Sequence, residues 1–412
     1  MGNTKIINLS LQKYRWLIAA AAVVMQLCLG TVYAWSVFKK PLMASHGWTE
    51  TATQIAFMIC IGMIGLCAAF GGILMDKKGP RLVATTGGIL FGLGTIIAAY
   101  ANHTGNLWLL YLGFGFIGGG GNGFAYVTPI ATLIRWFPDK RGLVTGLAVM
   151  GFGVGAFVMG RIAPIMINQA GITMTWFILG SVFLVLTVAM AQFFKNPPQG
   201  WIPHGFAPKA NSASFSANSW TFSEAFSSRQ WWMLWIIFFL NIFAGIGLLS
   251  QLSPMAQEIQ KNIIRDPAKL AVAGGLVVSI ASLFNGLGRL FWAWISDGIG
   301  RKNVFIIMFI SAALLYLALP HISQEMLFII VVSYLLACYG GGFSVMPAFI
   351  ADSFGPVHVG RIYGATLTAW GAAGVAGPLV FARLKDSAVY VSAAMLIIGL
   401  LITIAYKKPT GK

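Results

Sequence analysis

The chain has 412 residues, of which 58% are hydrophobic and only 9% carry a charge. Soluble domains carry about 25% charged residues, so this composition excludes an ordinary soluble protein and indicates an integral membrane protein. The formal net charge of +17 does not indicate nucleic-acid binding, because the Lys and Arg residues lie in short groups between apolar runs rather than in one basic cluster.

Twelve membrane-spanning helices are predicted from the uncharged windows. A helix needs about 20 apolar residues to cross the hydrocarbon of a bilayer. The windows 82–134 and 142–194 are long enough for two helices each and contain turn-forming residues at 101–106 and 168–171. The other windows supply one helix each: 16–38, 51–75, 231–257, 270–296, 303–324, 326–351, 362–382 and 387–406. We therefore expect an all-α membrane protein with twelve transmembrane helices.

The distribution of basic residues among the loops predicts the orientation. If both termini lie on one side, that side carries 18 Lys and Arg residues outside the windows and the other side carries 7. Cytoplasmic loops are enriched in Lys and Arg, so we expect both termini in the cytoplasm and the chain in the plasma (inner) membrane of the cell. The polar, Pro- and Ser-containing segment 196–229 is predicted to link two six-helix bundles, residues 1–195 and 230–412.

A short charged loop occurs once in each half. The first copy runs from Gly72 to Arg81 and contains Asp76, and the second contains Asp297 and Arg301. An arginine lies 65 residues after Asp76, and another lies 64 residues after Asp297. Two landmarks at nearly the same spacing indicate a duplication, and hence two pseudo-symmetric bundles. The alternative is that such loops only orient the helices.

Together, these features resemble the major facilitator superfamily of secondary transporters. The resemblance rests on the loop at 72–81, its weaker copy, the twelve helices and the six-plus-six division. Three shorter motifs, 33–36, 135–142 and 285–289, resemble the oxalate:formate antiporter family, and residues 136–155 are similar to a motif of monocarboxylate transporters. Both families handle small carboxylates, so the resemblance implies a small carboxylate substrate.

The resemblance also implies a mechanism. In transporters of this fold two halves rock about a site at the membrane midplane. We expect Asp76, Arg81, Asp297 and Arg301 to form cytoplasmic contacts that close the inner side and break when it opens.

Arg289 is the predicted substrate-binding residue. An arginine inside a membrane is costly and by default marks a functional site. Only Arg161 and Arg289 interrupt the apolar windows. Arg289 lies roughly 12 Å along its helix from Asp297, which places it near the midplane. Arg161 lies roughly 28 Å along its helix from Gly142, near the opposite interface, where its side chain can reach water. No acid lies at the depth of Arg289, so its expected counterion is an anion from solution; a helix contact is the alternative.

Several polar and aromatic residues are candidates for the walls of the same site. Ser282, Asn285 and Arg289 are spaced to share one helix face, so Asn285 is expected either to orient the guanidinium or to bind the substrate. Packing or anchoring at the membrane interface is an equally open alternative for the remaining candidates: Tyr33, Asn122, Tyr126, Tyr339 and Tyr363.

Trp370 suggests the size of the substrate. The resemblance to the oxalate:formate antiporters implies that, in that family, a lysine of the eleventh helix joins the arginine to hold a dicarboxylate. The position of this lysine corresponds to Trp370 in the present chain. The window 362–382 contains no Lys or Arg. A second carboxylate without a cation would carry a heavy desolvation cost. We therefore expect a monocarboxylate such as lactate or pyruvate, packed against Trp370; plain helix packing is the alternative role of this side chain.

Coupling to a proton is expected but has no obvious site. All ten acids and five histidines fall in loops or at helix ends, and Asp352 is the predicted least exposed acid. Obligatory carboxylate exchange is the alternative mechanism, and a transporter-like carboxylate sensor is the alternative function; a channel suits the duplicated halves less well. No nucleotide loop, His-x-x-x-His pattern or close Cys pair occurs, so we expect no enzyme activity, no metal and no cofactor.

Overall fold

The computed structural model describes residues 2–137, 139, 141–198, 201, 203, 220–355 and 358–409, without the side chains of residues 2–9, 76, 141–143 and 145. Over this part of the chain every regular element is a helix, which confirms the all-α fold class. The first set of helices, called here the N-terminal group, comprises α1 (Gly2–Gly30), η1 (Thr31–Ala34), α2 (Trp35–His46), α3 (Glu50–Lys78), α4 (Pro80–Thr104), α5 (Leu107–Leu110), η2 (Tyr111–Gly118), α6 (Gly119–Trp136) and α7 (Arg141–Ala191).

The second set is called here the C-terminal group. It comprises α10 (Arg229–Gln260), α11 (Pro267–Ile299), α12 (Arg301–Ala318), η3 (Leu319–His321), α13 (Glu325–Phe354), α14 (Val359–Thr366), α15 (Thr368–Leu384), η4 (Lys385–Ser387) and α16 (Ala388–Ala405). The short helix α9 (Phe222–Phe226) precedes it.

Nine helical stretches of the described chain are long and apolar enough to cross a membrane. Two of them contain a turn and so supply two helices each. α7 bends at Gly171, whose φ of 77° is favourable only for glycine, within the predicted break at 168–171. The stretch Val359–Ala405 turns at Lys385 between α15 and α16. With the helical run 107–136, these stretches are consistent with the twelve predicted passes.

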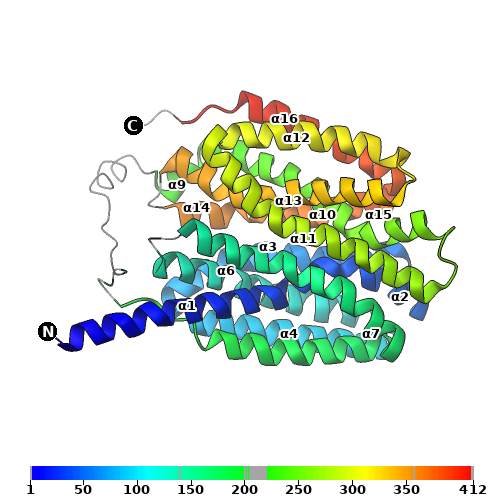
Figure 1. Ribbon diagram of the computed structural model, residues 1–412, viewed down its shortest axis with the longest axis horizontal. Coiled ribbons are helices and arrows are strands. Elements are labelled where there is room, and N and C mark those ends of the chain that lie inside the picture. Colours follow the sequence, from blue (N-terminus) through cyan, green and yellow to red (C-terminus); the bar gives the residue numbers. More distant parts are fainter. Residues whose placement is uncertain are drawn as a thin grey trace.

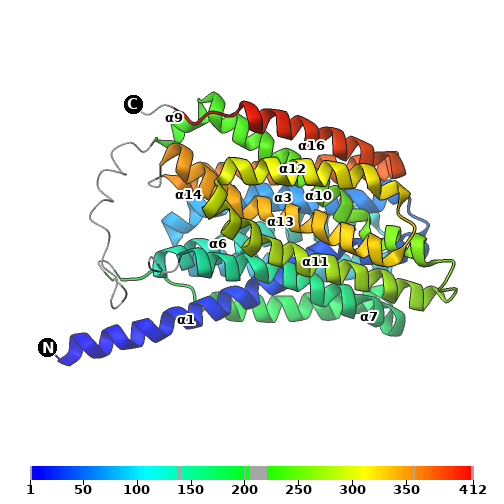
Figure 2. The ribbon, with the colours of Figure 1, turned by 45° about the horizontal axis from the view of Figure 1, so that its top comes forward.

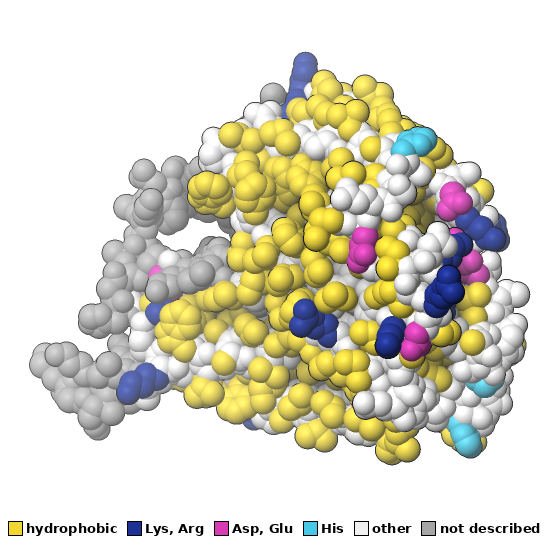
Figure 3. Space-filling view, turned by 45° about the vertical axis from the view of Figure 1, so that its right-hand side comes forward, with side chains coloured by type: hydrophobic (Ala, Val, Ile, Leu, Met, Phe, Trp, Pro, Cys, Tyr) yellow, Lys and Arg dark blue, Asp and Glu magenta, His cyan; other side chains and the backbone are white. Residues whose placement is uncertain are grey.

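The long helices run side by side along the longest axis of the molecule (Figures 1 and 2). The start of α1 and the end of α16 lie at the same end, together with α9 and α14 (Figure 1). We call the opposite end, with α2 and the connection between α10 and α11, the distal end. Figure 3 shows hydrophobic side chains over the flank and charged and His side chains gathered toward the distal end. An apolar flank with a polar end is what a protein embedded in a bilayer requires.

Glycines allow the two groups to approach closely. A Cβ atom at Gly65 of α3 would lie 2.5 Å from the backbone nitrogen of Gly371 in α15, and one at Gly153 of α7 would lie 2.8 Å from that of Gly286 in α11. Small residues are what lets helix backbones meet inside a membrane, where no hydrophobic effect drives them together. The two groups are therefore in backbone contact on both sides of the molecule.

A glycine within the N-terminal group provides a test of this packing. A Cβ at Gly155 would lie 2.0 Å from the backbone oxygen of Leu27, whereas one at Gly364 would meet nothing within 4 Å. We expect Gly155→Ala to destabilise the purified protein by about 1–3 kcal/mol, because α1 and α7 must move apart. Thermal unfolding in detergent should show a lower Tm for Gly155→Ala and no loss for Gly364→Ala. Equal Tm values for the two variants would contradict the packing described here.

Candidate functional site

Arg289 lies in α11 with only 1% of its surface exposed. Its Nη2 atom donates to Oδ1 of Asn285 at 3.4 Å, while Nε and Nη1 have no hydrogen-bond partner among the described residues. Asn285 is itself held in place, since its Nδ2 atom donates to the backbone oxygen of Leu336 in α13 at 3.1 Å. Ser282 is buried on the same helix. Asn285 thus orients the guanidinium from a fixed position, and two strong donors are left over.

Three basic side chains are buried within the described part of the chain, and Arg289 differs from the other two. Arg15 pairs with Asp139 and Lys39 pairs with Glu50, each at 2.8 Å. None of the ion pairs formed by the described residues includes Arg289. A buried charge without a counterion carries a large desolvation cost. Arg289 is therefore the buried cation whose charge the described residues leave uncompensated.

Six aromatic side chains form a connected group that meets the guanidinium at Phe343, called here the aromatic cluster: Tyr33, Tyr126, Phe152, Tyr339, Phe343 and Trp370. The guanidinium carbon of Arg289 lies 4.9 Å from the ring centre of Phe343, a cation–π contact. The ring of Phe343 lies 5.2 Å from that of Trp370, which lies 5.1 Å from Tyr126.

Phe152 of α7 links Tyr33 and Trp370 within the aromatic cluster. Its ring lies 4.7 Å from that of Tyr33 and 6.1 Å from that of Trp370. The six rings come from five elements of both groups, η1, α6, α7, α13 and α15. The structure thus brings helices that are far apart in the sequence together around Arg289.

Hydroxyl groups link the two groups of helices at this place. The Tyr33 and Tyr339 hydroxyl oxygens are 2.5 Å apart, joining η1 to α13. Only one of the two hydroxyls donates in this bond, so the other hydrogen is available to a further acceptor. Arg289 also interacts electrostatically with the hydroxyls of Tyr33 and Tyr126, and Nε1 of Trp370 is buried without a partner. The described residues of the site offer several donors and no carboxylate, which is the arrangement that suits an anion.

The remaining candidates lie at different distances from the cluster. Tyr363 is half-buried and donates to the backbone oxygen of Phe343 at 3.4 Å, so it lies directly beside the cluster. Asn122 is fully buried, and its Nδ2 atom donates to the backbone oxygen of Leu29 at 2.9 Å. Its hydrogen bond ties α6 to α1, which fits the packing alternative. Arg161 is exposed on α7, 5.5 Å from the ring centre of Phe157.

Phe152 and Phe343 were not predicted as site residues. Phe343 lies four residues after Tyr339 and therefore on the same helix face, which could have indicated it. Phe152 lies between Gly151 and Gly153, and nothing in that pattern distinguishes a site residue from a packing residue.

The predicted gating residues occupy the end of the molecule that carries the termini. Arg301 pairs with Asp297 at 2.6 Å and with Asp352 at 3.5 Å, so both of its partners belong to the C-terminal group. Arg81 is exposed. The side chain of Asp76 lies outside the described residues. A closing contact between the two groups through these residues stays a prediction.

The prediction that Asp352 is the least exposed acid is wrong. Its side chain is 45% exposed, compared with 17% for Asp139 and 29% for Glu50. Asp352 lies beside a cavity of about 220 Å³ near the end of α13, which gives it access to solvent. The more buried acids were overlooked because each is covered by a cation from a separate helix, Arg15 of α1 for Asp139 and Lys39 of α2 for Glu50.

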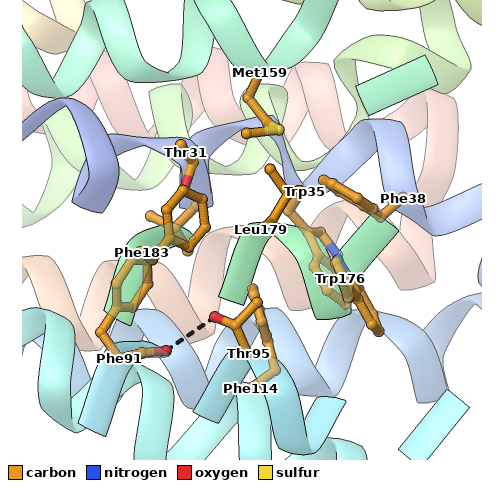
Figure 4. A pocket seen from close by; sticks show the side chains of 11 residues that line it. Thr31, Trp35, Phe38, Phe91, Thr95, Phe114, Met159, Trp176, Leu179 and Phe183 are labelled. Carbon is orange, nitrogen blue, oxygen red and sulfur yellow. Dashed lines mark hydrogen bonds between the residues drawn. The ribbon is translucent and has the colours of Figure 1, made fainter. Parts of the chain in front are cut away.

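A separate small cavity lies within the N-terminal group, between Thr31, Trp35, Thr95, Met159 and Trp176 (Figure 4). Its volume is about 30 Å³, and no charged side chain lines it. The Thr95 hydroxyl facing it donates to the backbone oxygen of Phe91. A cavity of this size has room for roughly one or two waters, so it does not compete with Arg289 as a site for a carboxylate.

Comparison with known proteins agrees with the geometry. The family model of the Major Facilitator Superfamily matches residues 16–378 and, in a second match, residues 268–411. The chain is 27% identical to the oxalate:formate antiporter of Oxalobacter formigenes over 356 residues, which cover 85% of this chain and 80% of that one.

Two further relatives have carboxylates in their names. The apicoplast pyruvate carrier 1 of Toxoplasma gondii is 26% identical over 350 residues, covering 71% of this chain and 62% of that one. Monocarboxylate transporter 13 of Rattus norvegicus is 30% identical over 157 residues, covering 37% of this chain and 36% of that one. Because the family match extends over most of an all-helical chain with membrane-spanning helices, the protein belongs to the Major Facilitator Superfamily of membrane transporters.

Proposed function

We propose that the protein transports small monocarboxylates such as lactate or pyruvate, and that Arg289 binds the carboxylate. The observation that carries this proposal is the buried guanidinium, which has two unpartnered donors and no counterion among the residues that the structure describes. A carboxylate accepts two parallel hydrogen bonds from a guanidinium in a favourable geometry. The names of the relatives, an oxalate:formate antiporter and a pyruvate carrier, support the same substrate class.

The aromatic cluster supports a single carboxylate. Phe343, which contacts Arg289, also contacts the fully buried Trp370, and none of the described residues of the cluster supplies a second cation. The rings of Tyr126, Phe152 and Phe343 surround the indole and offer an apolar wall to a short organic tail. One cation neutralises one carboxylate, so a dicarboxylate would leave one charge uncompensated in this setting.

Alternating access is the proposed mechanism. The N-terminal and C-terminal groups would rock about the site and expose it to each side in turn. We propose that the protein lies in the plasma membrane of the cell, with both termini in the cytoplasm. Binding of the anion neutralises Arg289, and this favours closure because an empty charged site is costly to enclose.

Arg289 provides the first test. We expect Arg289→Gln to fold but to weaken substrate binding at least about 30-fold, corresponding to the loss of ~2 kcal/mol from one charged hydrogen-bond partner. Counterflow of labelled lactate and pyruvate into proteoliposomes measures this. Arg161→Gln is the matched control, and it should keep substantial transport because Arg161 is exposed and lies apart from the cluster. Unchanged counterflow by a folded Arg289→Gln protein would refute the site assignment.

Trp370 provides a test of substrate size. We expect Trp370→Lys to shift the preference from monocarboxylates toward oxalate, because the added ammonium supplies a counterion for a second carboxylate. Competition of unlabelled lactate, formate and oxalate against labelled pyruvate gives the ratio directly. If the unmodified protein already exchanges oxalate faster than lactate or pyruvate, the argument from the single cation fails.

The coupling mechanism needs a separate experiment. We propose electroneutral symport of one proton with one monocarboxylate; the alternative is obligatory exchange, which the named antiporter relative favours. In exchange, an anion would accompany Arg289 through every reorientation, and no proton would be needed. Uptake into liposomes without internal substrate should follow an inward proton gradient if symport operates. Uptake that requires preloaded carboxylate and ignores the gradient would establish the exchanger, and binding without any accumulation would point to a sensor.

A further inference from the structure

Lys39 occupies an unexpected position near the distal end. The first spanning helix was predicted to end at residue 38, but α2 continues through Lys39 to His46. Only 2% of the Lys39 side chain is exposed. Its ammonium group donates to Oε1 of Glu50 in α3 at 2.8 Å and also to Oε1 of Gln251 in α10. The buried helix can continue past the charged Lys39 because the carboxylate of Glu50 compensates the charge.

These three side chains form a closed triangle of hydrogen bonds. Nε2 of Gln251 donates to the same Glu50 oxygen at 2.9 Å. Lys39 and Glu50 belong to the N-terminal group and Gln251 belongs to the C-terminal group. We call this triangle the distal latch.

A second bond between the same helices reinforces the distal latch. Nζ of Lys40 donates to Oε1 of Gln257 at 2.8 Å, and Gln257 donates in turn to Ser253 within α10. α2 and α10 are thus joined at two successive places by charge-assisted hydrogen bonds, which are stronger than bonds between neutral groups.

The distal latch lies between the substrate site and a large cavity. Tyr33 of the aromatic cluster lies in η1, three residues before Ser36, and Ser36 lies three residues before Lys39 in α2. A cavity of about 530 Å³ is lined by Lys40, Glu50 and Gln251, with an apolar wall that includes Phe328 and Phe381. A small carboxylate entering from the distal end toward Tyr33 would meet the latch first.

We propose that Lys39, Glu50 and Gln251 are the gate of the distal side, and that the hydrogen bonds of Gln251 to Lys39 and Glu50 must break each time the site opens in that direction. When the two groups separate there, Gln251 leaves with α10, and Lys39 becomes accessible to water. The latch therefore favours the closed distal side. The proposal requires only that the two groups part at this end, and it holds whichever solute the protein moves.

A cysteine in place of Ser36 reports on the gate without any transport assay. Ser36 is 1% exposed and lies one turn from Lys39 toward Tyr33. A charged, membrane-impermeant thiol reagent should label Ser36→Cys slowly when the latch is intact. Labelling is measured on intact cells and on inverted membrane vesicles, and the chain without the added cysteine gives the background from its four buried native cysteines.

Glu50→Gln removes the charge of the latch and keeps the shape of the side chain. We expect it to raise the labelling rate of Ser36→Cys several-fold, on one side of the membrane only. Gln251→Met, which removes the bond to the C-terminal group without changing any charge, should do the same. Glu325→Gln is the matched control, because Glu325 accepts from Gln260 at 2.7 Å within the C-terminal group.

The outcomes distinguish opening of the distal latch from a general loosening of the protein structure. Unchanged labelling in folded Glu50→Gln and Gln251→Met would overturn the proposal, and so would an equal rise in Glu325→Gln. If Glu50→Gln does not yield a monodisperse protein, the labelling rate of Gln251→Met decides. Failure of carboxylate transport together with a latch-dependent labelling rate would refute the proposed substrate and leave the gate intact.

Discussion

The structure is organised around a guanidinium that is buried without a carboxylate. Arg289 lies inside an apolar bundle, and the neighbours that hold it, Asn285 and the ring of Phe343, are neutral. Such a group is tolerated only if a functional gain offsets the desolvation cost. The surrounding side chains do not remove this cost. They orient the guanidinium, exclude water and add further donors, an arrangement that suits the anion of the proposed function.

The position of the site between the two groups follows from this constraint. Tyr33 and Tyr339 meet across the groups at 2.5 Å, and close backbone contacts such as that of Gly65 with Gly371 bring α3 against α15. Under the proposed function, residues that line the substrate site, such as Tyr33 and Tyr339, therefore also hold the groups together. In such an arrangement, occupancy of the site and relative position of the groups influence each other, as coupling between binding and conformation requires.

The fold and the burial of Arg289 could be predicted because both depend on patterns that are local in the sequence. Uncharged windows identify spanning helices, and an arginine within one of them is conspicuous, as Arg289 is. Trp370 was predicted from a resemblance and does lie in the aromatic cluster. Phe152 and Phe343 were missed because an aromatic residue in a membrane helix has the same local pattern whether it packs or binds. The burial of Lys39 was missed because its counterion comes from another helix.

Lys39 and Arg289 illustrate two opposite uses of a buried cation. Lys39 has its carboxylate, Glu50, within the same group of helices, so its charge is compensated whether or not Gln251 is in place. Arg289 has none among the described residues, so under the proposed function its charge is compensated only while an anion is bound. If the gate and the site act as proposed, the charge of Lys39 is compensated in every closed state. The charge of Arg289 is compensated in a closed state only when the site holds an anion. A gate would then have its counterion within the protein, whereas a binding site would take its counterion from the substrate. Enclosure of the site would therefore depend on the substrate.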